Sequence, residues 1–419
     1  MKKTILHITV LFYLMVLLLS CSNNDKSRGN NESNDIASQE NGFQSQVAKD
    51  KKPLTLNDEE RGCIDKVNEL AFTIMFNQSE KTPYKSFTFS PLGVSCALAM
   101  TGNGADGATL KEIENLIGPS ADANSFFSKY VAHLSSSVIM SNYLAINNRY
   151  PINQDFTKSI EGIYNAQVSN LEFGSNDAIQ RINDWIKQVS DGEFESVFDK
   201  TNANELIYLI TYMKFKALWK NPFKETSTSD KDFTNDNGST TQVPLMFQHV
   251  YADVGELYYQ NDKYQAISMG YDNSEFRMLI VLPKNTKIND IMSTMNANEF
   301  NHIISRLKSS KETIDLSLPR FSTSCTLNLQ ELLSTLMPTA FNDNANFSRL
   351  SKANSYLSRF TQDTKVVVTE YDTEASGVTK QTVTELSINP KYTANHPFLY
   401  FIYDNTTHVI LQAGQFCGD

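Results

Sequence analysis

Basic residues are too few in this sequence to give it a positive surface. Its 37 lysines and arginines are outnumbered by 47 aspartates and glutamates, the formal net charge is −10, and no segment concentrates lysine or arginine. Proteins that bind DNA or RNA carry a basic patch or stripe that meets the phosphates. The charge balance therefore argues against nucleic acid as a partner.

Cysteine and histidine are also scarce, with five and six residues, and neither forms a metal-binding pattern. There is no Cys-x-x-Cys pair and no His-Glu-x-x-His sequence, so no zinc site is indicated. Cys63, Cys96, Cys325 and Cys417 are widely scattered, which favours buried thiols, although disulfides stay open for an exported protein. We expect no metal and no cofactor.

Two glycine-containing enzyme motifs are present only in part. Residues 102–107 match the dinucleotide-binding fingerprint, but helix-forming residues precede them and no acidic residue follows about 20 positions on. Residues 93–97 lack one glycine of the nucleophile elbow of hydrolases. We expect a helix that starts at Ser90-Pro91, a turn between two helices at 102–107, and no enzymatic activity. A hydrolase with a dispersed triad is the remaining enzyme alternative.

What the sequence does contain begins with an export signal. Lys2 and Lys3 precede an apolar run over 4–19 that is short for a membrane span, and Leu-Ser-Cys ends at Cys21. This resembles the lipobox of bacterial lipoproteins, with a plain signal peptide as the alternative. We expect a signal peptide over 1–20, lipid on Cys21 and a polar, disordered tether over 21–54. The outer membrane is the expected location, facing either the periplasm or the outside.

From residue 55 onward, helix and strand patterns mix without an internal repeat or a further linker. Because they do not alternate regularly, we expect an α+β fold with largely antiparallel sheets. Helical periodicity occurs in 61–76, 98–100, 110–117 and 182–189, and strand-like runs occur in 207–215, 277–282, 314–318, 365–369 and 398–403.

Two segments of the carboxy-terminal half carry the most specific pattern. Residues 392–402 read Tyr-Thr-Ala-Asn-His-Pro-Phe-Leu-Tyr-Phe-Ile, and residues 366–375 read Val-Val-Val-Thr-Glu-Tyr-Asp-Thr-Glu-Ala. They are similar to the signature and the reactive-loop hinge of the serpin family. Further segments match in serpin order at 89–91, 182–185, 215–223, 243–246, 318–321 and 345–348.

The resemblance implies a single serpin domain over 55–419, with large mixed and antiparallel sheets, about eight or nine helices and an exposed reactive-centre loop near 370–390. It also implies a suicide-substrate inhibitor of serine proteases. The protease cleaves the loop, and the cleaved loop inserts into a sheet as a new strand while the covalent acyl-enzyme persists. The implied partners are target serine proteases, and we expect a monomer. A serpin-fold binding protein that does not inhibit is the alternative.

The loop passes a test of alternation, because successive residues of a strand face opposite sides. Counted inward from Thr373, residues 373, 375, 377, 379, 381 and 383 are all uncharged, whereas Glu374 and Lys380 face the other way. A shift of one residue would bury both charges, at several kcal/mol per unpaired ion. The expected hinge residues are Glu370, Asp372, Thr373, Glu374, Ala375, Ser376 and Gly377.

Family spacing also implies the reactive bond. Eleven residues back from Pro397 and sixteen forward from Glu370 both reach Leu386, so the bond is Leu386–Ser387. Leucine suits chymotrypsin-like, elastase-like, cathepsin-G-like or subtilisin-like proteases. Val383 and Thr384 offer neighbouring bonds to elastase-like enzymes. Cleavage at Lys380 would leave a strand too short to insert.

The sequence departs from the family at the hinge and at the point where the sheet opens. Asp372 stands where serpins usually have glycine, which restricts the backbone. Ser90 is kept, but Gly93, Thr211 and Gln362 stand where a second serine, an asparagine and a histidine are usual. Trp219 matches an aromatic residue beneath the top of the sheet, with ordinary core packing as the alternative.

Overall fold

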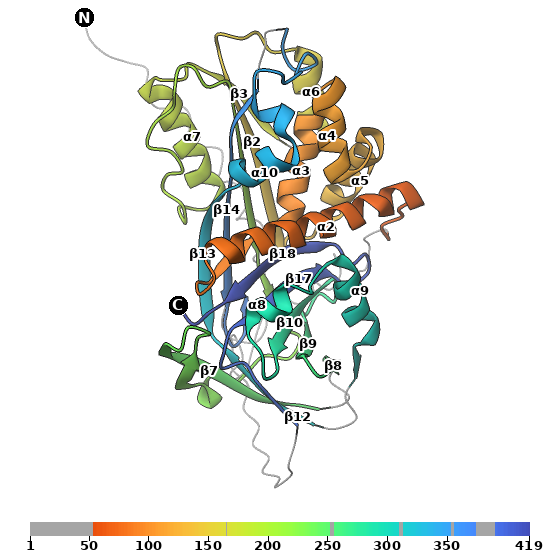
Figure 1. Cartoon of the computed structure of the whole chain (residues 1–419), viewed down its shortest axis with the longest axis vertical. Helices are drawn as coiled ribbons and strands as arrows, with labels where there is room; N and C mark the ends of the chain where they lie inside the picture. Colours follow the sequence, from red (N-terminus) through yellow and green to blue (C-terminus); the bar gives the residue numbers. More distant parts are fainter. Residues whose placement is uncertain (1–52, 165, 252–254, 310–312, 353–355, 374–389) are drawn as a thin grey trace, which may run out of the picture. The chain divides into compact units, whose positions relative to one another are not determined.

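The computed structural model describes residues 53–164, 166–251, 255–309, 313–352, 356–373 and 390–419. Leu54–Asp419 forms one compact unit. Within the described residues, nine α-helices, two short 3-10 helices and eighteen strands form an α+β fold (Figure 1), which confirms the expected fold class. No helix in this part of the chain combines the length and the hydropathy that a membrane span needs.

The first long helix, α2 (Asp58–Lys81), begins with a capping box. The Asn57 side chain accepts a hydrogen bond from the Glu60 amide, and the Glu60 carboxylate accepts one from the Asn57 amide. The remaining helices are α3 (Pro91–Gly102), α4 (Gly107–Ile117), α5 (Ser120–His133), α6 (Gln154–Tyr164), α7 (Asn176–Val189), α8 (Ile288–Met292), α9 (Ala297–Arg306), α10 (Gln330–Leu336), η1 (Glu225–Ser227) and η2 (Pro338–Phe341).

Helix α3 corrects one prediction and confirms two. Ser90 caps its amino terminus with Pro91 in the first position, as expected. The turn at 102–107 joins α3 to α4, and Gly107 there has a φ of 58°. The short amphipathic helix expected at 98–100 is wrong, because all twelve residues of α3 are buried. A helix buried on every side has no polar face, and the sequence pattern cannot show this in advance.

Two of the large sheets take most of their strands from the second half of the chain. The strands predicted at 277–282, 314–318 and 398–403 are confirmed and belong to these sheets. The seven-stranded sheet has the order β1 (Phe87–Phe89), β18 (Ile410–Phe416), β17 (Phe398–Asp404), β10 (Phe276–Pro283), β9 (Tyr264–Gly270), β8 (Leu257–Gln260) and β11 (Lys308–Ser309). The four-stranded sheet has the order β16 (Lys391–Thr393), β12 (Ile314–Pro319), β7 (Thr240–Val250) and β6 (Ser229–Thr234).

The five-stranded sheet contains the elements that matter most for function. Its third strand, β4 (Ile207–Phe215), is parallel to β14 (Leu357–Val368) and antiparallel to β2 (Val138–Asn147), so a parallel pair lies inside a mixed sheet. A separate pair of two-residue strands, β15 (Asp372–Thr373) and β5 (Ala217–Leu218), adjoins it. The sheet order is β13 (Phe321–Asn328), β14 (Leu357–Val368), β4 (Ile207–Phe215), β2 (Val138–Asn147) and β3 (Gln167–Leu171).

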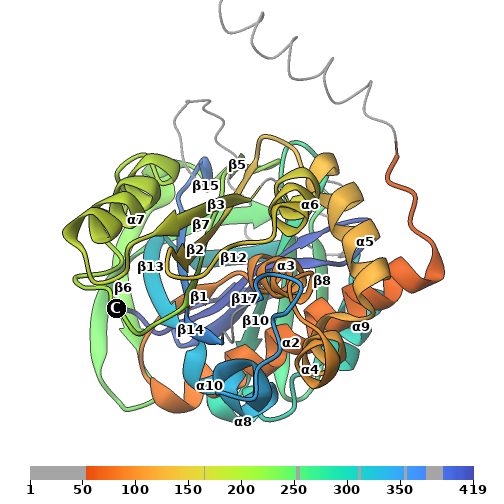
Figure 2. The ribbon, with the colours of Figure 1, turned by 90° about the horizontal axis from the view of Figure 1, so that it is seen from above.

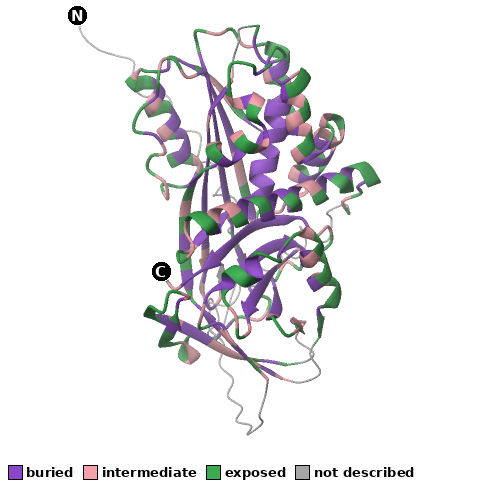
Figure 3. Cartoon of the chain, viewed as in Figure 1, coloured by how far each residue is buried: buried purple, intermediate pink, exposed green. Residues whose placement is uncertain are grey.

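The two faces of this sheet pack differently. In Figures 1 and 2, α7 lies over one face, and α3 to α6 lie towards the other. The α7 face is a separate apolar cluster that includes Trp185, Tyr143, Tyr208 and Tyr212, with the Trp185 ring stacked on Tyr143 at 5.0 Å. The opposite face packs against the main hydrophobic core of the protein. Figure 3 shows that most residues of the central strands are buried.

Candidate functional site

The parallel contact between β4 and β14 is the centre of the candidate site. It runs from the pair Leu357–Ile207 to the pair Lys365–Lys214 and is called the seam below. After Val368 the chain turns back, and β15 pairs antiparallel with β5, Asp372 with Leu218 and Thr373 with Ala217. Because β5 continues β4 across one residue, the chain after β14 already runs antiparallel beside the extension of β4.

The expected hinge is held at this turn by backbone hydrogen bonds. The amide of Trp219 donates to the carbonyl of Tyr371 at 2.9 Å, and the amide of Phe223 donates to the carbonyl of Glu370 at 2.7 Å. The Trp219 indole Nε1 donates to the Thr369 carbonyl at 3.0 Å. Three consecutive hinge carbonyls are therefore bound by the segment that follows β4.

The Trp219 side chain is held by burial and by stacking on Tyr271. It is 3% exposed and stacks on Tyr271, with ring centroids 4.6 Å apart and planes 11° from parallel. Stacking and burial hold the ring, and the indole N–H finds its partner in the hinge. Trp219 thus has a specific contact with the hinge in addition to its place in the core.

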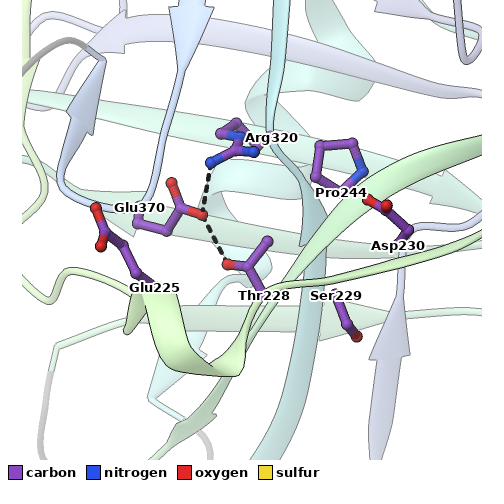
Figure 4. A pocket seen from close by; sticks show the side chains of 7 residues that line it. All are labelled: Glu225, Thr228, Ser229, Asp230, Pro244, Arg320 and Glu370. Atoms are coloured by element: carbon purple, nitrogen blue, oxygen red, sulfur yellow. Dashed lines mark hydrogen bonds and ion pairs between the residues drawn. The ribbon is translucent and has the colours of Figure 1, made fainter.

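Glu370 anchors the hinge through its side chain. It is 3% exposed, and its Oε1 accepts from the Thr228 hydroxyl at 2.7 Å and from Arg320 Nη1 at 3.4 Å. Figure 4 shows these contacts at a polar pocket of about 430 Å³. The pocket is lined by Glu225, Thr228, Ser229, Asp230, Pro244, Arg320 and Glu370.

The sequence reasoning missed the partners of Glu370. Arg320 lies in one of the matched segments, but the segment alone does not say which carboxylate it meets. Arg320 and Thr228 are 50 and 142 residues from Glu370 along the chain. No local sequence signal connects residues at that separation.

Ser90 and Gln362 form the main polar connection beneath the seam. The side-chain oxygen of Gln362 accepts from the Ser90 amide at 2.8 Å, and its Nε2 donates to the Ser90 carbonyl at 2.9 Å. The Ser90 hydroxyl donates to the carbonyl of Leu411 at 2.6 Å. Gln362 is completely buried, so this two-pronged contact ties β14 firmly to the start of α3.

Thr211 and Gly93 adjoin this connection in different ways. Thr211 pairs in register with Gln362 across the seam, but in the described part of the chain its buried hydroxyl has no hydrogen-bond partner. A Cβ at Gly93 would lie 3.1 Å from the Gln362 amide nitrogen and 3.2 Å from the Ser90 hydroxyl oxygen. The absence of a side chain at Gly93 therefore leaves room for Gln362, and the two departures from the family pattern fit each other.

Several predicted residues lie outside the described residues. They are Cys21, Glu374, Ala375, Ser376, Gly377, Leu386 and Ser387. The four cysteines of the described chain are free; Cys63, Cys96 and Cys417 are buried, and Cys325 is half-buried. No group of three or more histidine, cysteine or acidic side chains in the described ranges could hold a metal ion.

The fold and site define an α+β protein whose central sheet has a parallel seam and whose chain, after one of the seam strands, folds back under a clamped hinge. The chain belongs to the serpin family, since the family model for serpins (serine protease inhibitors) matches residues 65–418. Members of this family are typically protease inhibitors rather than enzymes, and some do not inhibit.

Individual relatives agree over nearly the whole chain. A serpin-like protein of Thermococcus kodakarensis is 25% identical, covering 99% of this chain and 98% of its own. The native structure of the thermophilic serpin tengpin superposes with a TM-score of 0.77 at 26% identity, covering 87% of this chain and 96% of its own. Human thyroxine-binding globulin, complexed with its hormone, gives a TM-score of 0.77 at 25% identity, covering 85% and 98%.

Proposed function

We propose that this chain is a suicide-substrate inhibitor of chymotrypsin-like, elastase-like or subtilisin-like serine proteases. The observation that carries the proposal is the antiparallel pairing of Thr373 with Ala217 at the top of a parallel seam. A strand placed between two parallel neighbours can run antiparallel to both, and a chain that turns back after β14 has that direction. The cleaved loop would enter the seam as this strand.

Continuing the register of β15 along β4 gives the proposed inserted form. Positions 375, 377, 379, 381 and 383 would stand opposite Phe215, Met213, Thr211, Leu209 and Ile207. All five are buried, and the four apolar ones belong to the main core. Directly paired residues share a face, so these uncharged positions would be buried. The register derived from the hinge therefore selects the same inward set as the alternation of the sequence.

The opposite face is less open to water than the alternation alone suggests. Glu374 would stand opposite Lys216, which is exposed, but Lys380 would stand opposite Ile210, which is buried beneath α7. The long Lys380 side chain would therefore have to reach solvent around α7. We expect insertion to need some adjustment of α7 at this level.

The covalent step balances without any further reagent. The protease serine oxygen attacks the carbonyl carbon of Leu386, the Leu386–Ser387 peptide bond breaks, and the Ser387 amine leaves with the proton of the serine. An ester then joins Leu386 to the protease. Leu386 is thirteen positions after Thr373, so full insertion would carry the ester roughly 40 Å along the sheet. Trapping requires insertion of the loop to be faster than hydrolysis of the ester by water.

The amino-terminal features complete the proposal. We propose that the chain is a monomer whose signal peptide is removed and whose Cys21 is acylated, which anchors the serpin domain to a bacterial outer membrane. Stable anchoring needs more than one acyl chain, as bacterial lipoproteins carry. The polar residues that follow Cys21 support a tether between lipid and domain.

Incubation with chymotrypsin, followed by denaturing gel electrophoresis, tests the proposal. A covalent complex that survives SDS is expected, and mass spectrometry of the released carboxy-terminal fragment should give Ser387 as its first residue. The control is Leu386→Asp, which removes the apolar residue that the protease pocket accepts. Clean cleavage at Leu386 without a complex would instead favour a serpin-fold binding protein that does not inhibit.

A further inference from the structure

A half-buried carboxylate, that of Glu193, joins the two seam strands near the hinge. Lys214 of β4 and Lys365 of β14 are paired in register across the seam. Glu193, in the turn after α7, places its Oε1 2.8 Å from the ammonium of Lys214 and 3.3 Å from the ammonium of Lys365. One oxygen thus accepts from both strands, at the last register pair before the chain turns back.

The turn that carries Glu193 is held by two hydrogen bonds to Ser190 and by an aromatic contact with β4. Asp191 and Gly192 have φ values of 51° and 80°, which reverse the chain directly after α7. The Ser190 carbonyl accepts from the Glu193 amide at 3.0 Å, and the Ser190 hydroxyl accepts from the Phe194 amide at 3.1 Å. Phe194 packs edge-on against Tyr212 of β4, with ring centroids 6.1 Å apart. The position of the carboxylate is therefore fixed by α7 and its cap.

Glu193 compensates the charge of two lysines that the closed seam places side by side. Like charges directly opposite one another in a sheet repel, and the side chains of Lys214 and Lys365 are only 16% and 27% exposed. Glu193 neutralises one of the two charges and attracts both. A strand inserted between β4 and β14 would move their backbones from about 4.8 Å to about 9.6 Å apart, which breaks the bridge and relieves the repulsion.

The Glu193 bridge lies at the end of the seam nearest the hinge, so a strand entering from the hinge would have to break it early. In the proposed register, position 376 would stand opposite Lys214, three residues after Thr373. Another ion pair across the seam, Arg359 with Glu205 at 3.2 Å, lies at its far end. A loop that enters from the hinge meets Glu193 first.

We propose that Glu193 is a positioning residue that holds the seam closed and sets the rate at which a strand enters it. Within the proposed inhibitory function, on which this inference rests, Glu193 delays insertion until cleavage frees the loop. Its loss would let Lys214 and Lys365 push the seam strands apart.

The test uses a strand supplied from outside, so it does not depend on any protease. Purified protein is incubated with a synthetic peptide of residues 373–384, and conversion to a form with a higher melting temperature is followed with time. Glu193→Gln is expected to take up the peptide about fivefold faster, the change that losing about 1 kcal/mol of attraction produces. Glu195→Gln is the matched control, since Glu195 is exposed in the same turn. It should leave the rate unchanged.

A second variant separates charge from packing. The double variant Glu193→Gln with Lys365→Gln lacks the repulsion between the two lysines, so its rate of peptide uptake should return close to that of the parent. If the single variant instead acted by loosening the packing, the effects of the two substitutions on the rate would add, and the double variant would take up peptide faster still. If Glu193→Gln alone does not fold, the double variant is expected to fold and take up peptide at the parental rate. Equal rates for the parent, Glu193→Gln and Glu195→Gln would overturn the inference, whatever chymotrypsin does. Faster uptake by Glu193→Gln, without any chymotrypsin complex, would refute the proposed inhibition alone.

Discussion

Asp363, a single residue of β14, makes the stability of the folded protein depend on pH. It is completely buried, and its Oδ1 accepts from the Thr326 hydroxyl at 2.5 Å, while its Oδ2 has no partner among the described residues. Across the seam it faces Tyr212, and Lys365 follows two positions later on the same strand face. Burial raises the pKa of the Asp363 carboxyl from 3.8 to about 6, and the hydrogen bond from Thr326 offsets only part of this.

A raised carboxyl pKa makes the native state bind the extra proton between about pH 4 and 6, so its stability falls as the pH rises through this window. We expect Asp363→Asn to remove this loss and to gain stability relative to the parent by up to roughly 3 kcal/mol above pH 6. Denaturant unfolding at pH 4.5, 5.5 and 7.5 measures the difference. Asp184→Asn, at an exposed position of α7, is the control. Parallel pH profiles for Asp363→Asn and the parent would refute the prediction.

At the scale of elements, β15 is where the proposed insertion would begin. Two residues already pair antiparallel beyond the end of β4, and the hinge before them is held through Thr369, Glu370 and Tyr371. A strand nucleus of this kind needs only to lengthen, because each added residue forms hydrogen bonds without a new loop to close. Thr373, the last residue of β15, would therefore control the first step of insertion between β4 and β14.

Replacing Thr373 with arginine should convert the inhibitor into a substrate. In the proposed register, position 373 leads into the buried face, and an unpaired ion there costs several kcal/mol. Cleavage by chymotrypsin should proceed while the yield of covalent complex falls at least tenfold. Glu374→Arg, which places the same side chain on the opposite face, should retain inhibition. An unchanged complex with Thr373→Arg would contradict the insertion mechanism.

At the scale of the whole molecule, the proposed function requires one sheet to exist in two forms. The parallel seam of the described structure lacks the antiparallel strand that the chain itself could supply. Such a molecule gains stability after cleavage, since nine positions from 375 to 383 would gain neighbours on both sides. The native fold is then the less stable of the two.

Cleavage of the loop should raise the melting temperature by roughly 6–12 °C, if each of the nine inserted residues adds about 0.5–1 kcal/mol of net hydrogen bonding and a unit of this length loses about 0.8 kcal/mol of stability per degree near its melting temperature. Scanning calorimetry before and after limited cleavage at Leu386 measures the change. The Thr373→Arg protein, cleaved at the same bond, should gain much less. An equal melting temperature for the native and cleaved parent would show that no strand enters the seam.

Much of the fold was within reach of the sequence. The strand at 207–215 coincides with β4, and the helix start at Ser90-Pro91 was predicted from local chemistry. The start of helix α3 was predicted, but its length and its burial on every side were not, because complete burial removes the polar face on which a periodicity pattern depends. The partners of Glu370 and the bridge made by Glu193 were missed because they join segments far apart in the chain.

The sequence by itself determined the class of protein: ordered motifs, strand alternation and capping residues are local patterns, and each constrains the backbone near it. Only the tertiary structure decided that Gln362 binds Ser90 where Gly93 leaves room, that the hinge already pairs with Ala217, and that one carboxylate holds Lys214 beside Lys365. The physical reason is that hydrogen bonds and ion pairs depend on distances of about 3 Å between groups, and the packing of distant segments sets those distances.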